Sequence, residues 1–359
     1  MKVVLTVLDA LPVRHVGPSH TPNLAALAAV GGRAPQGATA VMTSATYPNH
    51  ATFVTGAGPD RHGIVTNWVP STGRVTPAWE RGCDVATLFD ACRAAGRSSA
   101  AVYGDQHLVG VTGATVADHH WPPHGAVPAG LTCDEMGYLR DADTATALAA
   151  VLDTAPDLVV SQLNGPDTAA HVHGPDSEAA LAGYLATDTW LDVLRAQVAW
   201  DDTVWILVSD HDQEAVGASP AVDLQGALDA RGDGLFALPE GNAALVCGAG
   251  AVTAADALAG FDGVAGAQPF VLADETMECC LVWAGPGRVF GFPGVPTPRG
   301  THGGPRSRAQ VAIVTGGHPA VEPLAGALEQ HTVHAADWAP TVATLLGLDL
   351  PDATGRSLL

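Results

Sequence analysis

Acidic residues follow three apolar runs of the sequence at the point where each run ends. Asp9 and Asp210 close two of these runs, and Asp167 comes a few residues beyond the third. Continuous runs of β-branched residues and leucine are typical of buried strands in a parallel sheet, whose carboxyl ends meet at one edge. Three carboxylates at such an edge repel one another, and a divalent cation is the usual means of holding them together. The sequence therefore predicts a metal site at this edge.

Histidines accompany the acids at spacings that suit metal ligands. Asp167 and His171 stand at positions i and i+4, so a helical turn would place both on one face. His211 directly follows Asp210, and His302 is followed by two glycines, which let the backbone approach a site closely. Carboxylate oxygens and imidazole nitrogens are the donors that zinc takes. The number of donors fits two metals better than one, and the residue types leave manganese or iron open as alternatives to zinc.

Alternating strands and helices must position these side chains. Apolar runs predict strands over residues 2–8, 98–103, 158–163, 203–208 and 311–314. Helical spacing predicts helices over residues 22–30, 51–54, 85–95, 144–152, 177–199 and 335–346. A loop is expected over 56–63, whereas 106–140 and 217–300 lack a regular pattern. The alternation predicts an α/β fold, a mostly parallel sheet with helices on both faces, in a single domain over 1–359 with an inserted or edge subdomain within 217–300.

Composition limits the partners of the chain. Its 37 acidic residues against 16 basic ones give a net charge of −21, which argues against binding to a nucleic-acid polymer. No apolar stretch reaches the length of a membrane span, and because the sequence shows no basic n-region or cleavage site before its first strand, we expect no signal peptide. The six cysteines include no C-x-x-C pair, so we expect them to be reduced and the protein to be cytoplasmic.

A further segment links the acids and histidines to a known family. TYPNHATFVTG at 46–56 and RHGIVTN at 61–67 resemble the nucleotide pyrophosphatase/phosphodiesterase family of the alkaline phosphatase superfamily. Other matches follow in the order of the family: TPNLAALAAVGG at 21–32, PDTAAHVHGPDS at 166–177, SDH at 209–211, THGG at 301–304 and HAADWAPTVATLLGLDLP at 334–351. The resemblance is weak only over 217–300. It implies an alkaline-phosphatase-like three-layer sandwich.

The resemblance also implies a role for each matching residue. One zinc would be held by Asp9, Asp210 and His211 and would also bind the Thr46 oxygen, and a second zinc would be held by Asp167, His171 and His302. Thr46 would be the nucleophile, Asn67 would donate a hydrogen bond to a phosphoryl oxygen, and Tyr47 would stack on the leaving group or base. Zinc coordination lowers the pKa of a hydroxyl, which makes an alkoxide and then a phosphothreonine intermediate accessible.

Departures from the family pattern bear on the substrate. Ala10 and Asp212 stand where the family usually has glycine, and neither changes a metal ligand. No arginine lies near Thr46 in the sequence to bind a monoester dianion, which favours a diester, although Arg14, Arg61 or Arg299 could fold inward.

The expected function is a phosphodiesterase or nucleotide pyrophosphatase acting on a small, nucleotide-like phosphate ester. The first alternative is a phosphomonoesterase or phosphonate hydrolase on the same metal core. The second is a metal-binding protein that has lost turnover, and the third is a mutase, for which the usual serine nucleophile and cap signals are not evident.

Overall fold

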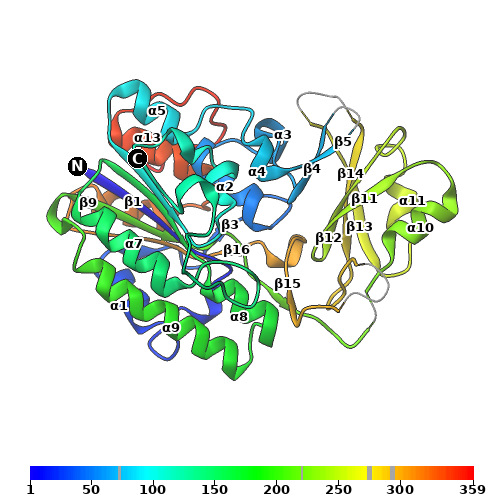
Figure 1. Cartoon of the computed structure of the whole chain (residues 1–359), viewed down its shortest axis with the longest axis horizontal. Coiled ribbons are helices and arrows are strands. Elements are labelled where there is room, and N and C mark those ends of the chain that lie inside the picture. Colours follow the sequence, from blue (N-terminus) through cyan, green and yellow to red (C-terminus); the bar gives the residue numbers. More distant parts are fainter. Residues whose placement is uncertain (72–73, 220, 273–276, 292–295) are drawn as a thin grey trace.

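The computed structural model describes residues 1–359 with the exception of 72–73, 220, 273–276 and 292–295. A central sheet lies between two layers of helices, and a smaller sheet projects from one end of this core (Figure 1). Over the described residues, no helix is both long enough and apolar enough to cross a membrane.

The central sheet has seven strands in the order β2-β17-β9-β1-β8-β6-β7. Their bounds are β1 (Lys2–Leu8), β2 (Gly32–Arg33), β6 (Ser99–Tyr103), β7 (His119–Trp121), β8 (Leu158–Leu163), β9 (Thr203–Val208) and β17 (Ala312–Thr315). The five strands from β9 to β7 run parallel, whereas β17 is antiparallel to β9 and β2 is antiparallel to β17. The predicted mostly parallel sheet is therefore confirmed.

Register aligns the ends of the three central strands. Val3 pairs with Leu158 and Leu8 with Leu163, and on the other side Val7 pairs with Val208. Every residue of β8 and β9 is buried, as the apolar runs require for strands covered on both faces. The residues after each strand consequently start from the same edge of the sheet.

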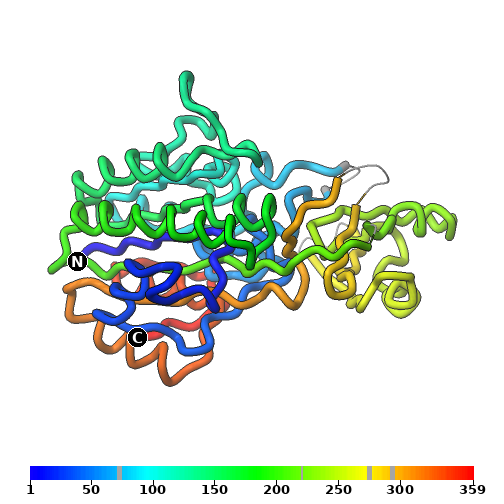
Figure 2. Tube along the Cα trace, turned by 90° about the horizontal axis from the view of Figure 1, so that it is seen from below, coloured from blue at the N-terminus to red at the C-terminus, as the bar shows by residue number. Residues whose placement is uncertain are grey.

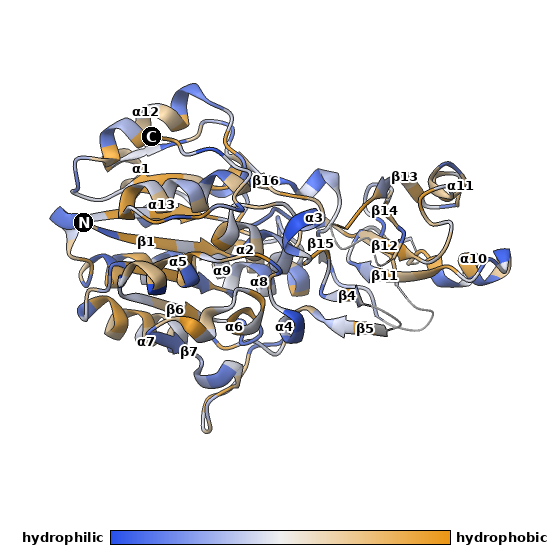
Figure 3. Ribbon diagram, turned by 90° about the horizontal axis from the view of Figure 1, so that it is seen from above, coloured by the Kyte–Doolittle hydropathy of each residue, from blue (hydrophilic) through white to orange (hydrophobic). Residues whose placement is uncertain are grey.

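Each face of the sheet packs against its own set of helices. One core contains Val3 and Leu5 with side chains of α2, α5, α6, α12 and α13, and the other contains Val4 and Leu8 with side chains of α1, α7 and α9. The bounds are α1 (Pro22–Val30), α2 (Thr46–Thr55), α5 (Leu88–Ala95), α6 (Leu108–Val111), α7 (Asp141–Asp153), α9 (Glu178–Arg195), α12 (Val321–Gln330) and α13 (Trp338–Leu346). Most of β1 is coloured as hydrophobic in Figure 3, in accord with its place between the two cores.

The described residues between 217 and 300 form a regular unit. Four antiparallel strands in the order β11-β12-β14-β13 carry two helices, α10 and α11, and Figure 2 shows them away from both termini. The bounds are α10 (Leu224–Arg231), β11 (Phe236–Glu240), β12 (Ala243–Cys247), α11 (Ala255–Ala259), β13 (Val264–Phe270) and β14 (Cys279–Ala284). The sequence did not predict these individual elements, because alanine and glycine blur the alternation that marks a strand.

Several boundaries also differ from those that the sequence predicts. The helix expected over 51–54 begins at Thr46, and the expected loop over 56–63 contains a one-turn helix. The remaining elements are α3 (Pro59–His62), α4 (Ala78–Arg81), α8 (Gly165–His173), β3 (Ala38–Thr39), β4 (Trp68–Ser71), β5 (Arg74–Pro77), β10 (Glu214–Ala215), β15 (Gly300–Thr301) and β16 (Ala309–Gln310). The 3-10 turns are Val13–His15, Ala114–Val116, Pro123–Gly125, Trp200–Asp202, Pro305–Ser307 and Ala335–Asp337.

The two-sided core gives a stability prediction. Leu5 is 0% exposed at the centre of β1, and Leu5→Ala should lower the free energy of unfolding by about 2–5 kcal/mol because it leaves a cavity. Leu185→Ala removes the same atoms from α9, where the side chain is 41% exposed, and should cost less than about 1 kcal/mol. Urea denaturation of the two variants measures the difference, and equal losses would contradict the proposed core.

Candidate active site

The carboxyl edge of the central sheet collects the acids that the sequence predicts there. Asp9 follows β1 and Asp210 follows β9, and both side chains are fully buried. The turn after β1 is fixed by Ala10, whose N–H donates to Asp210 Oδ1 at 3.0 Å. Ala10 has a φ of 53°, a left-handed conformation that favours glycine. This conformation accounts for the glycine that the family usually has at this position.

A first cluster consists of Asp9, Asp210 and His211. Their ligand atoms all lie within 4.8 Å of one another, and His211 Nε2 is 3.5 Å from Asp210 Oδ2 and 3.7 Å from Asp9 Oδ1. Burial, together with the neighbouring Asp210 carboxylate, raises the pKa of Asp9 well above its ordinary value. Asp9 Oδ1 and Asp210 Oδ2 accept no hydrogen bond from the described residues. Buried, unsatisfied carboxylate oxygens fit a site built for a cation.

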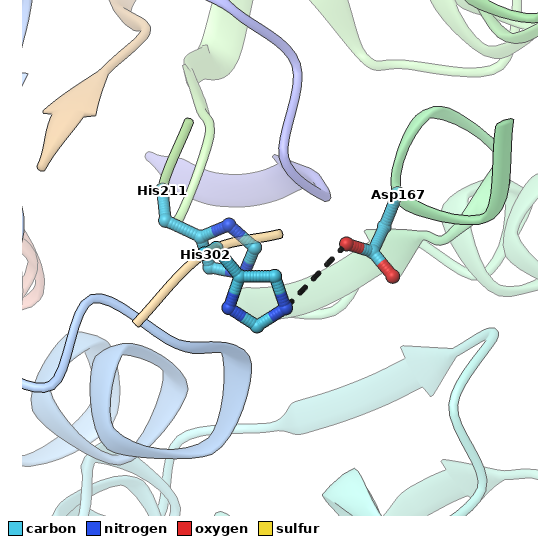
Figure 4. A group of neighbouring side chains, drawn as sticks. All are labelled: Asp167, His211 and His302. Atoms are coloured by element: carbon cyan, nitrogen blue, oxygen red, sulfur yellow. Dashed lines mark ion pairs between the residues drawn. The ribbon is translucent and has the colours of Figure 1, made fainter. Parts of the chain in front are cut away.

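A second cluster shares His211 with the first. Asp167, His211 and His302 bring ligand atoms within 4.8 Å of one another, and Figure 4 shows both imidazoles beside the Asp167 carboxylate. The rings of His211 and His302 stack with centroids 4.0 Å apart. His171 Nε2 approaches Asp167 Oδ1 at 3.4 Å, from one turn further along α8. The six predicted ligands therefore lie together as two adjoining groups.

Hydrogen bonds at Nδ1 orient two of the imidazoles. Nδ1 of His171 lies 2.9 Å from the Gly300 carbonyl and Nδ1 of His211 lies 3.1 Å from the Asp212 carbonyl, so each nitrogen is assigned as the donor. In a neutral ring, Nε2 then carries a lone pair, and in both residues it faces a carboxylate. A divalent metal placed between Nε2 and the carboxylates would be bound by both, so these residues fit a metal site.

Thr46 lies at the edge of the first cluster. It is the first residue of α2, and its Oγ1 is 3.2 Å from His211 Nε2. The start of a ten-residue helix presents free N–H groups and a partial positive charge, which favour an anion. One turn later, His50 Nδ1 lies 2.9 Å from the Thr46 carbonyl. The predicted nucleophile is thus held by a helix rather than by a loop.

Two glutamines that sequence reasoning missed hold the cluster acids. Gln162 Nε2 donates to Asp9 Oδ2 at 2.6 Å, and Gln213 Nε2 donates to Asp167 Oδ1 at 2.6 Å. Gln162 thereby leaves Oδ1 of Asp9 facing His211. Gln213 instead holds Oδ1 of Asp167, the oxygen that also faces His171 and His302. Gln162 also accepts from the N–H of Asp105 at 2.9 Å, which ties β6 to the same edge. For Gln162, a polar residue near the end of an apolar strand was the available signal.

Asp105 is a fourth acid at this edge. It follows β6 as Asp9 follows β1, and burial raises its pKa to about 7. The hydroxyl of Tyr47 bonds to it, and the Tyr47 ring packs edge-on against Trp79 at 6.2 Å. Because Tyr47 is only 3% exposed, its ring has little face left for a substrate. Trp68, directly after Asn67, is instead 47% exposed.

The three arginines considered from the sequence lie outside the two clusters. Arg14 Nη1 pairs with Asp212 Oδ2 at 2.7 Å, and Arg14 Nε pairs with Asp176 at 2.8 Å. Asp212 therefore forms part of a brace between the loops after β1, α8 and β9. Arg61 lies 3.7 Å from a surface aspartate, and the Arg299 side chain is exposed.

Acids and imidazoles held in this way suit a metal-dependent hydrolase, and the surrounding fold is shared with solved ectonucleotide pyrophosphatase/phosphodiesterase structures. The chain belongs to the type I phosphodiesterase/nucleotide pyrophosphatase family, whose model matches residues 3–265. The members of this family are hydrolases of phosphoric esters and anhydrides, and the resemblance seen in the sequence is confirmed.

Solved structures agree with this assignment at low sequence identity. Murine ectonucleotide pyrophosphatase/phosphodiesterase 5 matches with a TM-score of 0.76 and 18% identity, over 99% of this chain and 98% of that one. The human protein of the same name matches with a TM-score of 0.77 and 17% identity, over 99% of this chain and 97% of that one. Phosphonoacetate hydrolase from Sinorhizobium meliloti matches with a TM-score of 0.69 and 17% identity, over 96% of each chain. A sequence search of curated proteins finds no match.

The role of Gln213 can be tested through metal affinity. Gln213→Ala should weaken metal binding by roughly tenfold to a hundredfold, because Asp167 loses the amide that orients it. Titration with a competing chelator measures the change. Gln225→Ala is the matched control, since this amide accepts from the Ala237 N–H at 2.9 Å in the smaller sheet. Equal metal affinity in both variants would contradict the role assigned to Gln213.

Proposed function

We propose that this protein is a two-zinc phosphodiesterase or nucleotide pyrophosphatase that uses Thr46 as its nucleophile. The observation that carries the proposal is the 3.2 Å distance between Thr46 Oγ1 and His211 Nε2. His211 belongs to both acid–histidine clusters. A hydroxyl at this point is beside any metal that the clusters hold.

The proposed ligand sets follow the family resemblance. Asp9, Asp210, His211 and the Thr46 oxygen would hold one zinc, and Asp167, His171 and His302 would hold the other. Bound zinc would supply Lewis acidity, a lowered pKa for the threonine hydroxyl and an activated water.

The residues of the chain itself position the reacting groups. Thr46 Oγ1 loses its proton and attacks phosphorus, the P–O bond to the leaving group breaks, and the leaving oxygen takes up a proton from water to depart as an alcohol. Thr46 then carries the phosphoryl group, with the remaining ester substituent, until water attacks phosphorus and releases Thr46 with its hydroxyl restored. The start of α2 stabilises the negative charge beside Thr46. Asn67 donates its side-chain amide to a phosphoryl oxygen.

Charge around the site favours a diester. Arg14 is engaged by two aspartates, whereas the buried Asp105 and Glu240, whose pKa values burial raises to about 7, carry part of a negative charge near the clusters. Near pH 7 a monoester carries up to one more negative charge than a diester. An arginine would therefore attract a monoester more strongly than a diester, and these carboxylates repel it more strongly. This argument supports the diester over the monoester.

Ligands of the structural neighbours support a nucleotide-like substrate. An inactive variant of the murine protein, with alanine in place of a threonine, was solved in complex with AMP. The exposed Trp68 ring beside Asn67 offers a surface for a base. The second candidate, a phosphonate hydrolase on the same core, is favoured by the fold of the Sinorhizobium meliloti enzyme, solved with phosphonoacetate.

Substrate preference separates these candidates. With zinc present, kcat/KM for bis-(p-nitrophenyl) phosphate should exceed that for p-nitrophenyl phosphate by about tenfold or more, because the monoester's extra charge meets Asp105 and Glu240. Phosphonoacetate should release no phosphate. A large preference for the monoester, or rapid cleavage of phosphonoacetate, would contradict the diester proposal in favour of the corresponding rival.

Replacement of the nucleophile tests the mechanism. Thr46→Ala should lower kcat by roughly a thousandfold or more, whereas Thr46→Ser should retain part of the activity because it keeps a hydroxyl. Thr146→Ala, which removes an exposed hydroxyl bonded to the Ala142 carbonyl on α7, is the control and should be unaffected. Steady-state hydrolysis at equal metal content gives the comparison. Full activity in Thr46→Ala would show that another group is the nucleophile.

A further inference from the structure

The main chain of Asn67 is held on both sides of the residue. Its N–H donates to Glu240 Oε2 at 2.6 Å, and its carbonyl accepts from the Ala78 N–H at 3.0 Å. Within the described part of the chain, no hydrogen bond engages the Asn67 side-chain amide. The backbone is thus fixed while the amide is left for another partner.

Glu240 is an unusual partner for a main-chain N–H. The side chain is 6% exposed, and over the described residues it forms no ion pair with a lysine or arginine. Burial raises its pKa to about 7. A carboxylate in such a place costs free energy that a neutral side chain would avoid. Its hydrogen bond to Asn67 is the contact that offsets this cost.

The residues after Glu240 are seated against a predicted metal ligand. The Asn242 N–H donates to the His302 carbonyl at 2.8 Å, and Asn242 Oδ1 accepts from the Gly304 N–H at 2.5 Å. Gly241 has a φ of +61°, and a Cβ there would lie 2.3 Å from the His302 carbonyl oxygen. Only glycine allows so close an approach. The turn between β11 and β12 therefore has a fixed position relative to the site.

We propose that Glu240 is a positioning residue of the catalytic site, acting through the main chain of Asn67. Its carboxylate orients the Asn67 peptide so that the side-chain amide points at a phosphoryl oxygen. The four-stranded sheet thereby contributes to catalysis, since Glu240 closes its strand β11. This inference rests on the proposed function of Asn67.

Two substitutions separate the hydrogen bond from the charge. Glu240→Ala should lower kcat by roughly tenfold to a hundredfold, with KM changed less than about threefold, because the misplaced amide matters most in the transition state. Vanadate mimics the transferring phosphoryl group, so its inhibition constant should rise by a factor similar to the loss of kcat. Glu240→Gln should stay within about threefold of wild type, because its amide oxygen can accept from Asn67. Equal losses in the two variants would overturn the proposal.

A double-mutant cycle distinguishes positioning from general stability. If Glu240 acts through Asn67, adding Glu240→Ala to Asn67→Ala should cause no further loss of kcat. Independent, additive losses would overturn the inference. Should Glu240→Ala fail to fold, Glu240→Met fills the same volume without accepting a hydrogen bond and takes its place.

The control lies in the same sheet. Glu278 accepts from the Gly250 N–H at 2.8 Å, and Glu278→Ala should leave kcat, KM and vanadate inhibition unchanged. All variants are compared at equal metal content and after thermal unfolding has been checked. If Thr46→Ala keeps its activity, the proposed function itself is wrong. If Thr46→Ala is inactive but Glu240→Ala is as active as the wild type, only the inference about Glu240 is wrong.

Discussion

Electrostatic repulsion among buried carboxylates is the constraint on which the site depends. The parallel register of β1, β8 and β9 brings Asp9, Asp167 and Asp210 to one edge, where water cannot screen their charges. Repulsion of this kind is tolerated when a cation lies between the oxygens. The imidazoles, whose Nε2 atoms face the carboxylates, complete the set of potential metal ligands. In the proposed mechanism the Thr46 hydroxyl would gain from the same cations, because a zinc-bound hydroxyl ionises more readily.

Rigid neighbours hold these donors in place. Gln162 and Gln213 each hydrogen-bond one carboxylate, and Arg14 braces the loops behind them through Asp212. The turn at Glu240 extends this support to the main chain of Asn67. Most of these contacts join segments far apart in the chain, so the site exists only when both sheets are folded. The smaller sheet is on this view a structural part of the active site.

The sequence predicted much of the fold and the candidate ligands, for a physical reason. Strand runs such as 158–163 and the i, i+4 pair of Asp167 and His171 are local signals, and the structure places both as expected. Glu240 and Gln213 could not be found, because their partners are remote in sequence and their own neighbours carry no pattern. The four-stranded sheet was missed since its alanine-rich strands lack clear alternation. The burial of Tyr47 likewise follows from tertiary packing.

Anomalous scattering from zinc-soaked crystals, measured on both sides of the zinc absorption edge, tests the central claim most directly. The account predicts two peaks at the carboxyl edge of the central sheet, one among Asp9, Asp210 and His211 and one among Asp167, His171 and His302. The Thr46 oxygen should lie within bonding distance of the first. No peak at this edge, with the carboxylates protonated and bonded to one another or to water, would contradict it.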